Sequence, residues 1–482
     1  MTDRHYDVLI VGAGISGISA AYYMKDMCPD KSFAILEGRE SIGGTWDLFK
    51  YPGIRSDSDM YTLGFAFRPW TSKKAIADGP SIMTYLHETI DEFNLDEKII
   101  FNQFVKTASW SSEESLWTVE VIEKGNTEPT HYTCNFLSMC PGYYDYKGGY
   151  MPEYKGVDDY EGPLIHPQQW PKDLNYTDKN IVVIGSGATA VTLVPELAKK
   201  AKHVTMLQRS PTYVVTAPDE DKIATLTNKI LPSKMAYSVS RWRKILVQRL
   251  NYALARKYPK FMKKLILAGV KKEMGKDYDL KHFYPSYNPW DQRICLVPNS
   301  DLFNSIKEGK SEVVTEEIET FTKEGITLKS GDKLQADIII SATGLNMKQM
   351  GGVTVIVDGA TINFADTVAY KSVMFSGIPN LSLAFGYTNA SWTLKCDLTN
   401  QYVCKLINHM DKHGYSSCTP TIKDKDMELL PFLDFTSGYI LRYLDELPKS
   451  GTKGPWKLKH NYIHDRMTLN RSKLADECMV FA

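Results

Sequence analysis

The apolar residues of this chain fall into two similar patterns, each opening with a short uninterrupted apolar run. The run at Asp7–Val11 is followed by the glycine-rich segment Gly12–Gly17 and then by apolar residues at helical spacing. Uninterrupted runs of this length are typical of strands buried in a parallel sheet. The pattern therefore predicts a strand, a tight turn and a helix near the start of the chain.

A second apolar run, Ser32–Leu36, ends at Glu37. In a dinucleotide-binding unit the first glycine permits the turn, the second brings the backbone to a pyrophosphate, and the third lets the helix pack on the strand. A carboxylate about 20 residues further on accepts hydrogen bonds from a ribose. Gly12, Gly14, Gly17 and Glu37 match this arrangement, which predicts a site for a nucleotide whose ribose carries no phosphate.

The same pattern returns at Asn180–Ile184, followed by Gly185–Ala190 and by a second apolar run, His203–Leu207. This run ends in Gln208 and Arg209 with no acidic residue. A guanidinium complements a ribose 2′-phosphate, which a carboxylate would repel. The second unit is therefore predicted to bind NADPH, and an ordinary surface charge is the alternative for Arg209. The predicted NADPH-binding residues are Gly185, Ser186, Gly187, Ala188, Thr189, Ala190, Gln208 and Arg209.

The remaining apolar patterns complete two sheets. Alternation from Ile99 to Glu123 predicts antiparallel strands, and short apolar runs before Gly142 and Gly344 predict strands that close each sheet. The sequence thus predicts an α/β protein with two Rossmann-like dinucleotide-binding domains, for FAD and NADPH, and a helical insertion in the NADPH domain. The expected bounds are 1–145 and 373–482 for the FAD-binding domain, 146–221 and 283–372 for the NADPH-binding domain, and 222–282 for the insertion.

Composition narrows the choice of partners. Lys and Arg number 57 and Asp and Glu also number 57, and the resulting net charge of zero argues against nucleic acid as a partner. The eight cysteines include no CxxC or CxxxxC pair, so neither a metal site nor a redox-active disulfide is expected and a disulfide reductase is disfavoured. Unpaired thiols and the lack of a recognisable targeting segment favour a cytoplasmic protein.

The segment 228–272 departs from this charge balance. It contains 13 Lys or Arg and no Asp or Glu, mixed with apolar residues at mostly helical spacing. A helical pair with one apolar and one basic face is predicted. We expect it to pack on the NADPH domain, because a run of charge is usually a solvated face. Peripheral contact with an anionic membrane is the alternative, and it would make the cytoplasmic protein membrane-associated.

The loop Gly43–Asp57 begins six residues after Glu37, so the reactive part of the first cofactor is expected to extend towards it. Its glycine pair lets the backbone approach a flat ligand closely. Trp46 offers a rigid wall, Tyr51–Gly53 predicts a turn, and Asp57 ends the loop with a negative charge.

Several stretches of the chain resemble the class B flavoprotein monooxygenases, specifically type I Baeyer–Villiger monooxygenases. Tyr160–Pro171 resembles that family's FxGxxxHxxxWP signature, with Tyr in place of the first Phe, and Gly43–Asp57 resembles its second signature. Tyr284–Arg293 and Gly386–Thr393 look like the bacterial subgroup that activates the prodrug ethionamide. The resemblance spans nearly the whole chain.

The resemblance implies a role for individual residues. It implies that Arg293 is the catalytic arginine at the flavin and that Asp57 holds it in place. It places Gly162, His166 and Trp170 in the linker between domains, where we favour hinge and clamp roles over proton transfer. The FAD-binding residues would be Gly12, Gly14, Ser16, Gly17, Glu37, Thr45, Trp46, Asp47, Asp57 and Val105. The same resemblance implies that Asn389 and Trp392 line the substrate or nicotinamide face.

The activity implied by the family is reduction of FAD by NADPH and addition of O2 to give a C4a-peroxyflavin. This species attacks a ketone, and rearrangement gives an ester or lactone. Oxidation of sulfides and thioamides is expected as a side activity. A flavin monooxygenase that acts mainly on sulfur or nitrogen nucleophiles is one alternative, and a non-catalytic redox-sensing flavoprotein is another. Some members have Lys where Gln292 stands, so the strength of the preference for NADPH over NADH stays open.

Overall fold

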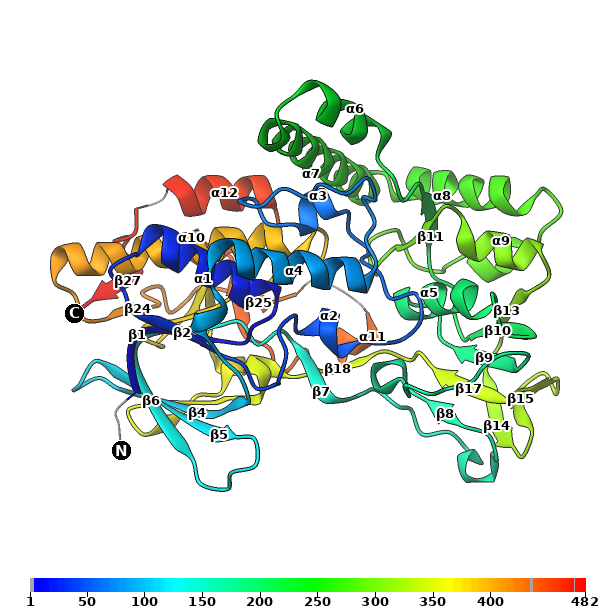
Figure 1. Ribbon diagram of the computed structural model, residues 1–482, viewed down its shortest axis with the longest axis horizontal. Helices are drawn as coiled ribbons and strands as arrows, with labels where there is room; N and C mark the ends of the chain where they lie inside the picture. Colours follow the sequence, from blue (N-terminus) through cyan, green and yellow to red (C-terminus); the bar gives the residue numbers. More distant parts are fainter. Residues whose placement is uncertain (1–3, 434–436, 472) are drawn as a thin grey trace.

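The computed structural model describes residues 4–433, 437–471 and 473–482. Two sheets lie at opposite ends of an elongated molecule, and the connecting strands and helices run between them (Figure 1). Each end has its own apolar core, built from the buried faces of its own sheet and helices. The two predicted units therefore fold as separate layers around separate cores.

The first sheet is built around the strand predicted at the start of the chain. The strand β1 (Arg4–Val11) pairs in parallel with β2 (Phe33–Leu36) and β6 (Thr130–Met139), and its residues Val8 to Ile10 are almost completely buried. In spatial order the strands are β20 (Ala360–Thr361), β19 (Thr354–Val357), β4 (Gln103–Ser111), β5 (Leu116–Glu123), β6, β1, β2 and β3 (Ile99–Ile100), and β23 (Leu381–Leu383) pairs with β6. The antiparallel strands predicted between Ile99 and Glu123 are β4 and β5, and β6, the strand predicted before Gly142, pairs antiparallel with β5.

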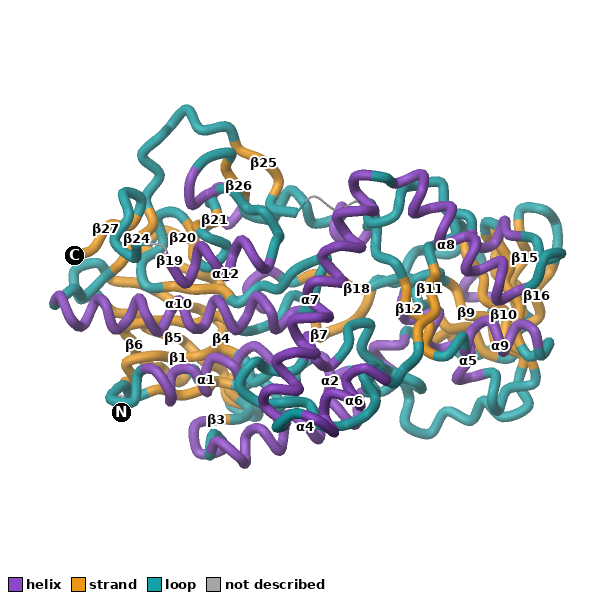
Figure 2. Tube along the Cα trace, turned by 90° about the horizontal axis from the view of Figure 1, so that it is seen from above, coloured by secondary structure: helices purple, strands orange, loops and turns teal. Residues whose placement is uncertain are grey.

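Helices cover one face of this sheet. The helix α1 (Ile15–Met27) packs beside α10 (Trp392–His413) over the strands, as Figure 2 shows. A buried bond joins them, because the Ser19 hydroxyl donates to the Asp397 carboxylate at 2.9 Å. The other helices of this end are α2 (Thr45–Leu48), α3 (Met60–Leu63), α4 (Gly79–Phe93), α11 (Gly438–Leu441) and α12 (Tyr462–Arg471).

The second sheet is parallel throughout. Its strand β9 (Asn180–Ile184) has the predicted bounds and lies between β10 and β17. In spatial order the strands are β13 (Ser311–Thr315), β10 (His203–Gln208), β9, β17 (Ile338–Ser341) and β8 (Leu164–Ile165). The helices α5 (Ala188–Leu197) and α9 (Asp301–Lys307) pack against it. The prediction of an α/β fold with two Rossmann-like units is confirmed.

Two crossing segments join the ends of the molecule. The strand β7 (Tyr144–Gly149), which leaves the first sheet, pairs antiparallel with β18 (Leu345–Met347), which leaves the second. The remaining short pairs are β11 (Val214–Ala217) with β12 (Cys295–Pro298), β14 (Ile318–Thr322) with β15 (Gly325–Leu328) and β16 (Lys333–Gln335), β21 (Ala369–Tyr370) with β22 (Met374–Phe375), β24 (Cys418–Pro420) with β27 (Met479–Phe481), and β25 (Leu429–Pro431) with β26 (Lys449–Gly451).

One predicted boundary needs correction. The strand β19 pairs in parallel with β4, with Thr354 opposite Thr107, so it belongs to the first sheet. The sequence analysis placed this strand in the NADPH-binding domain, which was expected to extend to residue 372. We therefore propose that the chain returns to the first domain just after β18 rather than at residue 373.

The insertion forms three helices, α6 (Lys222–Ile230), α7 (Ser233–Lys257) and α8 (Pro259–Met274). Packing on the second domain, as expected, holds for α8, which contacts β11 and α9. It is wrong for α7, which packs on α3 of the first domain. The buried Arg241 accounts for this docking, because its guanidinium donates to the Tyr61 and Gly64 carbonyls at 2.8 and 2.7 Å. None of the helices in the described residues is long and apolar enough to cross a membrane.

Replacing Arg241 by Leu should destabilise the first domain. The guanidinium also lies 3.5 Å from the Asp397 carboxylate, which would be left buried without its counter-charge. Removing one partner of a buried pair costs about 3–5 kcal/mol of unfolding free energy. Urea unfolding should show this loss, whereas the exposed Arg249→Ala control should change by less than about 0.5 kcal/mol. Equal unfolding curves for the two variants would contradict this role of Arg241.

Candidate active site

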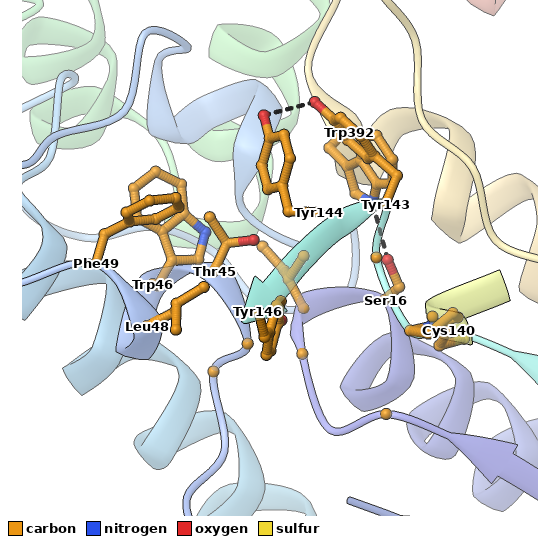
Figure 3. Close-up of a pocket in the computed structure, with 18 of the residues that line it drawn as sticks. Ser16, Thr45, Trp46, Leu48, Phe49, Cys140, Tyr143, Tyr144, Tyr146 and Trp392 are labelled. Atoms are coloured by element: carbon orange, nitrogen blue, oxygen red, sulfur yellow. Dashed lines mark hydrogen bonds between the residues drawn. The ribbon is translucent and has the colours of Figure 1, made fainter. Parts of the chain in front are cut away.

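A cavity of about 780 Å³ lies where the two domains meet, and both glycine-rich loops reach it. Gly12, Gly14 and Ser16 line it from the first unit, and Ala188 and Thr189 line it from the start of α5. In Figure 3 the side chains Thr45, Trp46 and Phe49 stand on one side, and Tyr143, Tyr144 and Trp392 stand on the other. The arrangement leaves one space that can hold parts of two nucleotides.

The first glycine loop is fixed by close contacts within the protein. Gly12 has a φ of +101°, and a Cβ added there would lie 2.6 Å from the Cys140 carbonyl oxygen. A Cβ on Gly17 would lie 1.8 Å from the Gly12 carbonyl oxygen. Gly17 does not line the cavity. The cofactor contact expected at Gly17 stays a prediction, and the close approach to Gly12 explains this glycine by the packing of α1 on β1.

Glu37 lies in the cavity wall at the end of β2 and is only 6% exposed. Its carboxylate accepts the backbone N–H groups of Ala13 at 2.7 Å and Arg39 at 2.9 Å. Burial raises the pKa of Glu37, and these two bonds oppose the shift. Val105 lines the same cavity, as expected. The carboxylate is thus held in place to accept a ribose hydroxyl.

The loop after Glu37 supplies part of the wall. Thr45, Trp46 and Asp57 line the cavity, as expected. Asp47 does not, because its carboxylate turns towards the cations Arg39 and Lys50, at 2.5 and 2.8 Å. The cofactor contact expected at Asp47 stays a prediction. This residue instead fixes the side chain of Arg39, which lines the cavity.

Arg293 and Asp57 come from different domains and meet in this cavity. The Arg293 Nη1 atom lies 3.9 Å from the Asp57 Oδ2 atom. The Arg293 side chain is 45% exposed, and it faces the cavity. Burial acts to lower the pKa of the Arg293 guanidinium, but Tyr143, Tyr439 and Asp57 outweigh burial and raise the pKa. Arg293 therefore stays a cation.

Asp57 titrates more easily than Arg293. Burial raises the pKa of the Asp57 carboxyl, and the charges of Arg293 and Arg55 oppose this shift. Asp57 therefore takes up a proton at a higher pH than an ordinary aspartate does. Its charge is the part of the pair that depends on pH.

An aromatic wall closes the cavity beside Arg293. Trp392 stacks on Tyr143 with ring centroids 5.1 Å apart, and its indole N–H donates to the Ser16 hydroxyl at 2.8 Å. The Tyr143 and Tyr144 hydroxyls are 2.7 Å apart, and burial raises the pKa of Tyr144 to about 12, so it stays neutral. Trp392 thus faces the cavity. Asn389 does not line the cavity, and its amide donates to the His460 carbonyl at 3.0 Å, so the contact expected at Asn389 stays a prediction.

The residues predicted in the second glycine loop differ in their surroundings. Gly185 has a φ of +137°, and a Cβ there would lie 2.4 Å from the Ala342 carbonyl oxygen, so packing explains this glycine. Gly187 differs, because an added Cβ would meet no described atom within 4 Å. The neighbouring Ser186 and Ala190 do not line the cavity, and Ala190 is completely buried, so their expected cofactor contacts stay predictions.

The side chains of Gln208 and Arg209, at the end of β10, lie in different surroundings. Gln208 is 2% exposed, and its amide donates to the His282 carbonyl and the Thr315 hydroxyl, both at 2.8 Å. These bonds hold the side chain inside the domain, and the contact expected between Gln208 and NADPH stays a prediction. Arg209 is exposed beside it and remains accessible to a ribose phosphate.

The linker motif forms a clamp outside the cavity. Gln168 N–H donates to His166 Nδ1 at 3.2 Å, which leaves Nε2 to carry the proton and donate to the Gly344 carbonyl at 2.9 Å. Burial lowers the pKa of His166, which favours this neutral form. A Cβ on Gly162 would lie 2.3 Å from the Tyr160 hydroxyl, and Trp170 packs on the core of the second domain. These contacts support the clamp role over proton transfer.

Sequence reasoning missed two parts of the site. Tyr143 and Tyr144 follow the apolar run before Gly142, and no motif in the sequence marked them as part of a site. Arg55, which lines the cavity, forms an ion pair with Asp301 of α9 at 2.6 Å. The only signal for Arg55 in the sequence was its position in the loop Gly43–Asp57, two residues before Asp57.

Two family profiles match the chain. Residues 75–351 match the flavin-binding monooxygenase-like family, and residues 10–72 match an NAD(P)-binding Rossmann-like domain. The FAD-containing monooxygenase EthA of Mycobacterium tuberculosis is 55% identical over 481 residues, which cover 99% of this chain and 98% of that protein.

The chain belongs to the flavin-binding monooxygenase-like family. The probable FAD-binding monooxygenase AlmA of an Acinetobacter species is 48% identical, with 99% of this chain and 97% of that protein covered. Among solved structures, a steroid monooxygenase bound to NADP matches with a TM-score of 0.77 at 20% identity, and cyclohexanone monooxygenase with 0.76 at 18%. Each match covers at least 99% of both chains. The expected resemblance and the expectation of a flavin- and nicotinamide-dependent monooxygenase are confirmed.

The residues of the cavity fit the two cofactors. Glu37 and the open backbone at Gly12 and Gly14 suit the ribose and diphosphate of FAD. Gly187 leaves space beside the start of α5, and Arg209 is exposed directly after β10, which suits a phosphorylated nicotinamide nucleotide.

Replacing Gly187 by Ala should weaken NADPH binding without harming the fold. Its φ of −80° suits alanine, and no described atom would meet the new Cβ, so only an approaching pyrophosphate is obstructed. We expect the dissociation constant for NADPH to rise at least about tenfold, with unchanged melting temperature and FAD content. Fluorescence titration would measure this, with Gly269→Ala, also in open space, as the control. Unchanged NADPH affinity would contradict the role of Gly187.

Proposed function

We propose that the chain is a Baeyer–Villiger monooxygenase. It consumes a ketone, O2, NADPH and a proton, and it releases an ester or lactone, NADP⁺ and water. Oxidation of sulfides and thioamides is proposed as a side activity. The observation that carries this proposal is the Arg293 guanidinium beside Asp57, in a cavity that both nucleotide loops reach. The names of the similar structures, a steroid and a cyclohexanone monooxygenase, support a ketone substrate.

FAD reduced by NADPH supplies the activated oxygen when it is bound. The chain's own residues then hold and orient the reactants. Glu37 and the Gly12–Gly17 loop hold the ribose and diphosphate, and Trp46 lies against the cavity as a rigid wall. The second loop and Arg209 hold the nicotinamide nucleotide, as proposed from the exposed Arg209 and the open space at Gly187.

Arg293 supplies a fixed positive charge at the reacting centre. When a nucleophile adds to a ketone, the carbonyl oxygen becomes negative, and a nearby guanidinium stabilises this charge. Asp57 keeps the guanidinium at the junction of the two domains through its opposite charge. The site therefore suits nucleophilic oxygen transfer to a carbonyl.

The lining near Arg293 favours apolar substrates. A second, much smaller cavity of about 20 Å³ is also lined by Arg293, together with Tyr143, Phe385, Trp392 and Tyr439. Tyr387 also lines it, and five aromatic residues beside one cation suit a ketone with an apolar substituent.

A monooxygenase acting mainly on sulfur or nitrogen nucleophiles is the second candidate, and the similarity to EthA at 55% identity keeps it open. Oxygen transfer to a carbonyl needs a negatively charged nucleophile, whereas oxygen transfer to sulfur needs an electrophile. One aryl ketone and one aryl sulfide, assayed over a pH series for NADPH use and product, separate the two. Ester formation that rises with pH supports the proposal. Sulfoxide as the sole product supports the alternative, and NADPH use without either product supports a redox sensor.

Arg293→Ala should separate reduction from oxygen transfer. We expect FAD to be reduced by NADPH as before, because the nucleotide loops are unchanged, while ester formation falls by about 10²–10³-fold. Anaerobic flavin bleaching and product chromatography measure the two steps. The control Arg209→Ala should raise the KM for NADPH and leave the product formed per NADPH unchanged. Ester formation by Arg293→Ala at the normal rate would remove Arg293 from the mechanism.

Asp57 should set the acid limit of the activity. Because burial raises the pKa of its carboxyl, protonation removes the counter-charge of Arg293 as the pH falls. We expect kcat to decline on the acid side at a higher pH than an ordinary aspartate would give. Asp57→Asn should be slow at every pH and lack this decline, whereas the exposed Asp358→Asn should keep it. An unchanged acid limb in Asp57→Asn would rule out this assignment.

A further inference from the structure

The insertion exposes an unusual number of large apolar side chains. Eleven of the 21 large apolar side chains exposed among the described residues lie within 223–265, which is less than a tenth of the sequence. Their exposed fractions run from 47% to 71%. Apolar side chains gathered in this way mark a surface that another body covers, whereas single ones scattered over a protein need no explanation.

These side chains form a stripe on the side of α7 that faces away from the protein. Met235, Val239, Leu246 and Leu250 follow the spacing i, i+4, i+11 and i+15, so they share one helical face. The opposite face is already used, because Tyr237, Arg241 and Ile245 are buried against the first domain. The helix α7 therefore already packs on the protein through its other face, and the apolar stripe stays exposed.

The neighbouring helices extend the same edge of the molecule. Figure 1 shows α6 and α7 projecting above the two domains, with α8 along the adjacent upper edge. On α6 the exposed apolar residues are Ile223, Leu226 and Ile230, at spacing i, i+3 and i+7. On α8 they are Phe261 and Leu265, at spacing i and i+4. We call the exposed faces of these three helices, with their basic side chains, the insertion surface.

The charged side chains of the insertion surface between 228 and 272 are all basic. Nine of the 13 basic residues between 228 and 272 are exposed, and this segment has no acidic residue. Two of the other basic side chains, Arg243 and Lys244, pair with Asp221 at the base of α6. On α8 the exposed Lys260 and Lys264 flank Phe261 and Leu265. Long basic side chains beside apolar ones suit an interface where apolar groups enter and charges stay at the surface.

From this combination we infer that the insertion surface docks on an anionic lipid membrane. The apolar residues enter the boundary between headgroups and acyl chains, and the lysines and arginines contact the negative headgroups. A second copy of the chain fits this surface poorly, because a symmetric contact would place the same nine basic side chains against one another. The contact is peripheral.

Co-sedimentation with vesicles tests the inference on the full-length protein loaded with FAD. With vesicles of mixed phosphatidylglycerol and phosphatidylcholine at low salt, most of the protein should sediment. With phosphatidylcholine alone, or with the mixed vesicles in about 0.5 M salt, less than about a tenth should sediment. Less than about a tenth with the anionic vesicles at low salt would overturn the inference.

Two double variants assign the binding to the insertion surface. Leu246→Ser with Leu250→Ser removes apolar contact, and Lys260→Glu with Lys264→Glu reverses charge, so each should lower the partition coefficient at least about tenfold. The matched controls are Leu429→Ser and Lys333→Glu, which change exposed residues elsewhere and should bind as the parent does. Turnover of NADPH without vesicles shows that each variant is folded. Unchanged binding in both double variants would also overturn the inference. So would a parent protein that does not bind vesicles but forms a concentration-dependent dimer, if the Leu246→Ser, Leu250→Ser variant abolishes that dimer.

Discussion

A cation from one domain and a carboxylate from the other must be held in the same cavity, and the site depends on this constraint. Arg293 comes from the segment before β12, Asp57 ends a loop of the first domain, and their charged atoms lie 3.9 Å apart. Partial burial of the Asp57 carboxyl has a cost, which shows in its raised pKa. The pair forms only when the two domains are docked, so the docking of the domains determines where the positive charge lies.

The contacts that set this docking are small and mostly polar. Arg55 reaches Asp301 at 2.6 Å, and a Cβ on Gly53 would come within 3.0 Å of the Glu196 side chain on α5. The crossing strands β7 and β18 pair, and the His166 clamp lies next to them. Because each domain keeps its own apolar core, such an interface can adjust while the domains stay folded. An enzyme that accepts electrons in one step and reacts with oxygen in another can use such movement between its domains.

Sequence patterns predicted the fold well because buried parallel strands and glycine turns are local features. The bounds of β9 and the position of Glu37 at the end of β2 follow from apolar runs and glycine spacing alone. The side-chain directions of Gln208 and Asn389 could not be predicted, because the carbonyls that hold them, of His282 and His460, lie far along the chain. Asp47 is held by near neighbours, but no motif indicated that its carboxylate would pair with Arg39 and Lys50. The helical pattern of α7 likewise showed that one face would be buried, but the domain that covers it depends on Arg241 and carbonyls far along the chain.

The most direct test of a shared site for two redox nucleotides is an anaerobic titration of the FAD-loaded protein with NADPH, followed by admission of O2 and a ketone. One equivalent of NADPH should bleach the yellow flavin fully. Oxygen should then restore the colour and yield one ester for each NADPH oxidised. A protein that does not take up FAD, a flavin that NADPH leaves yellow, or a colour that returns without any oxygenated product would contradict the claim that both nucleotides act in one cavity beside Arg293.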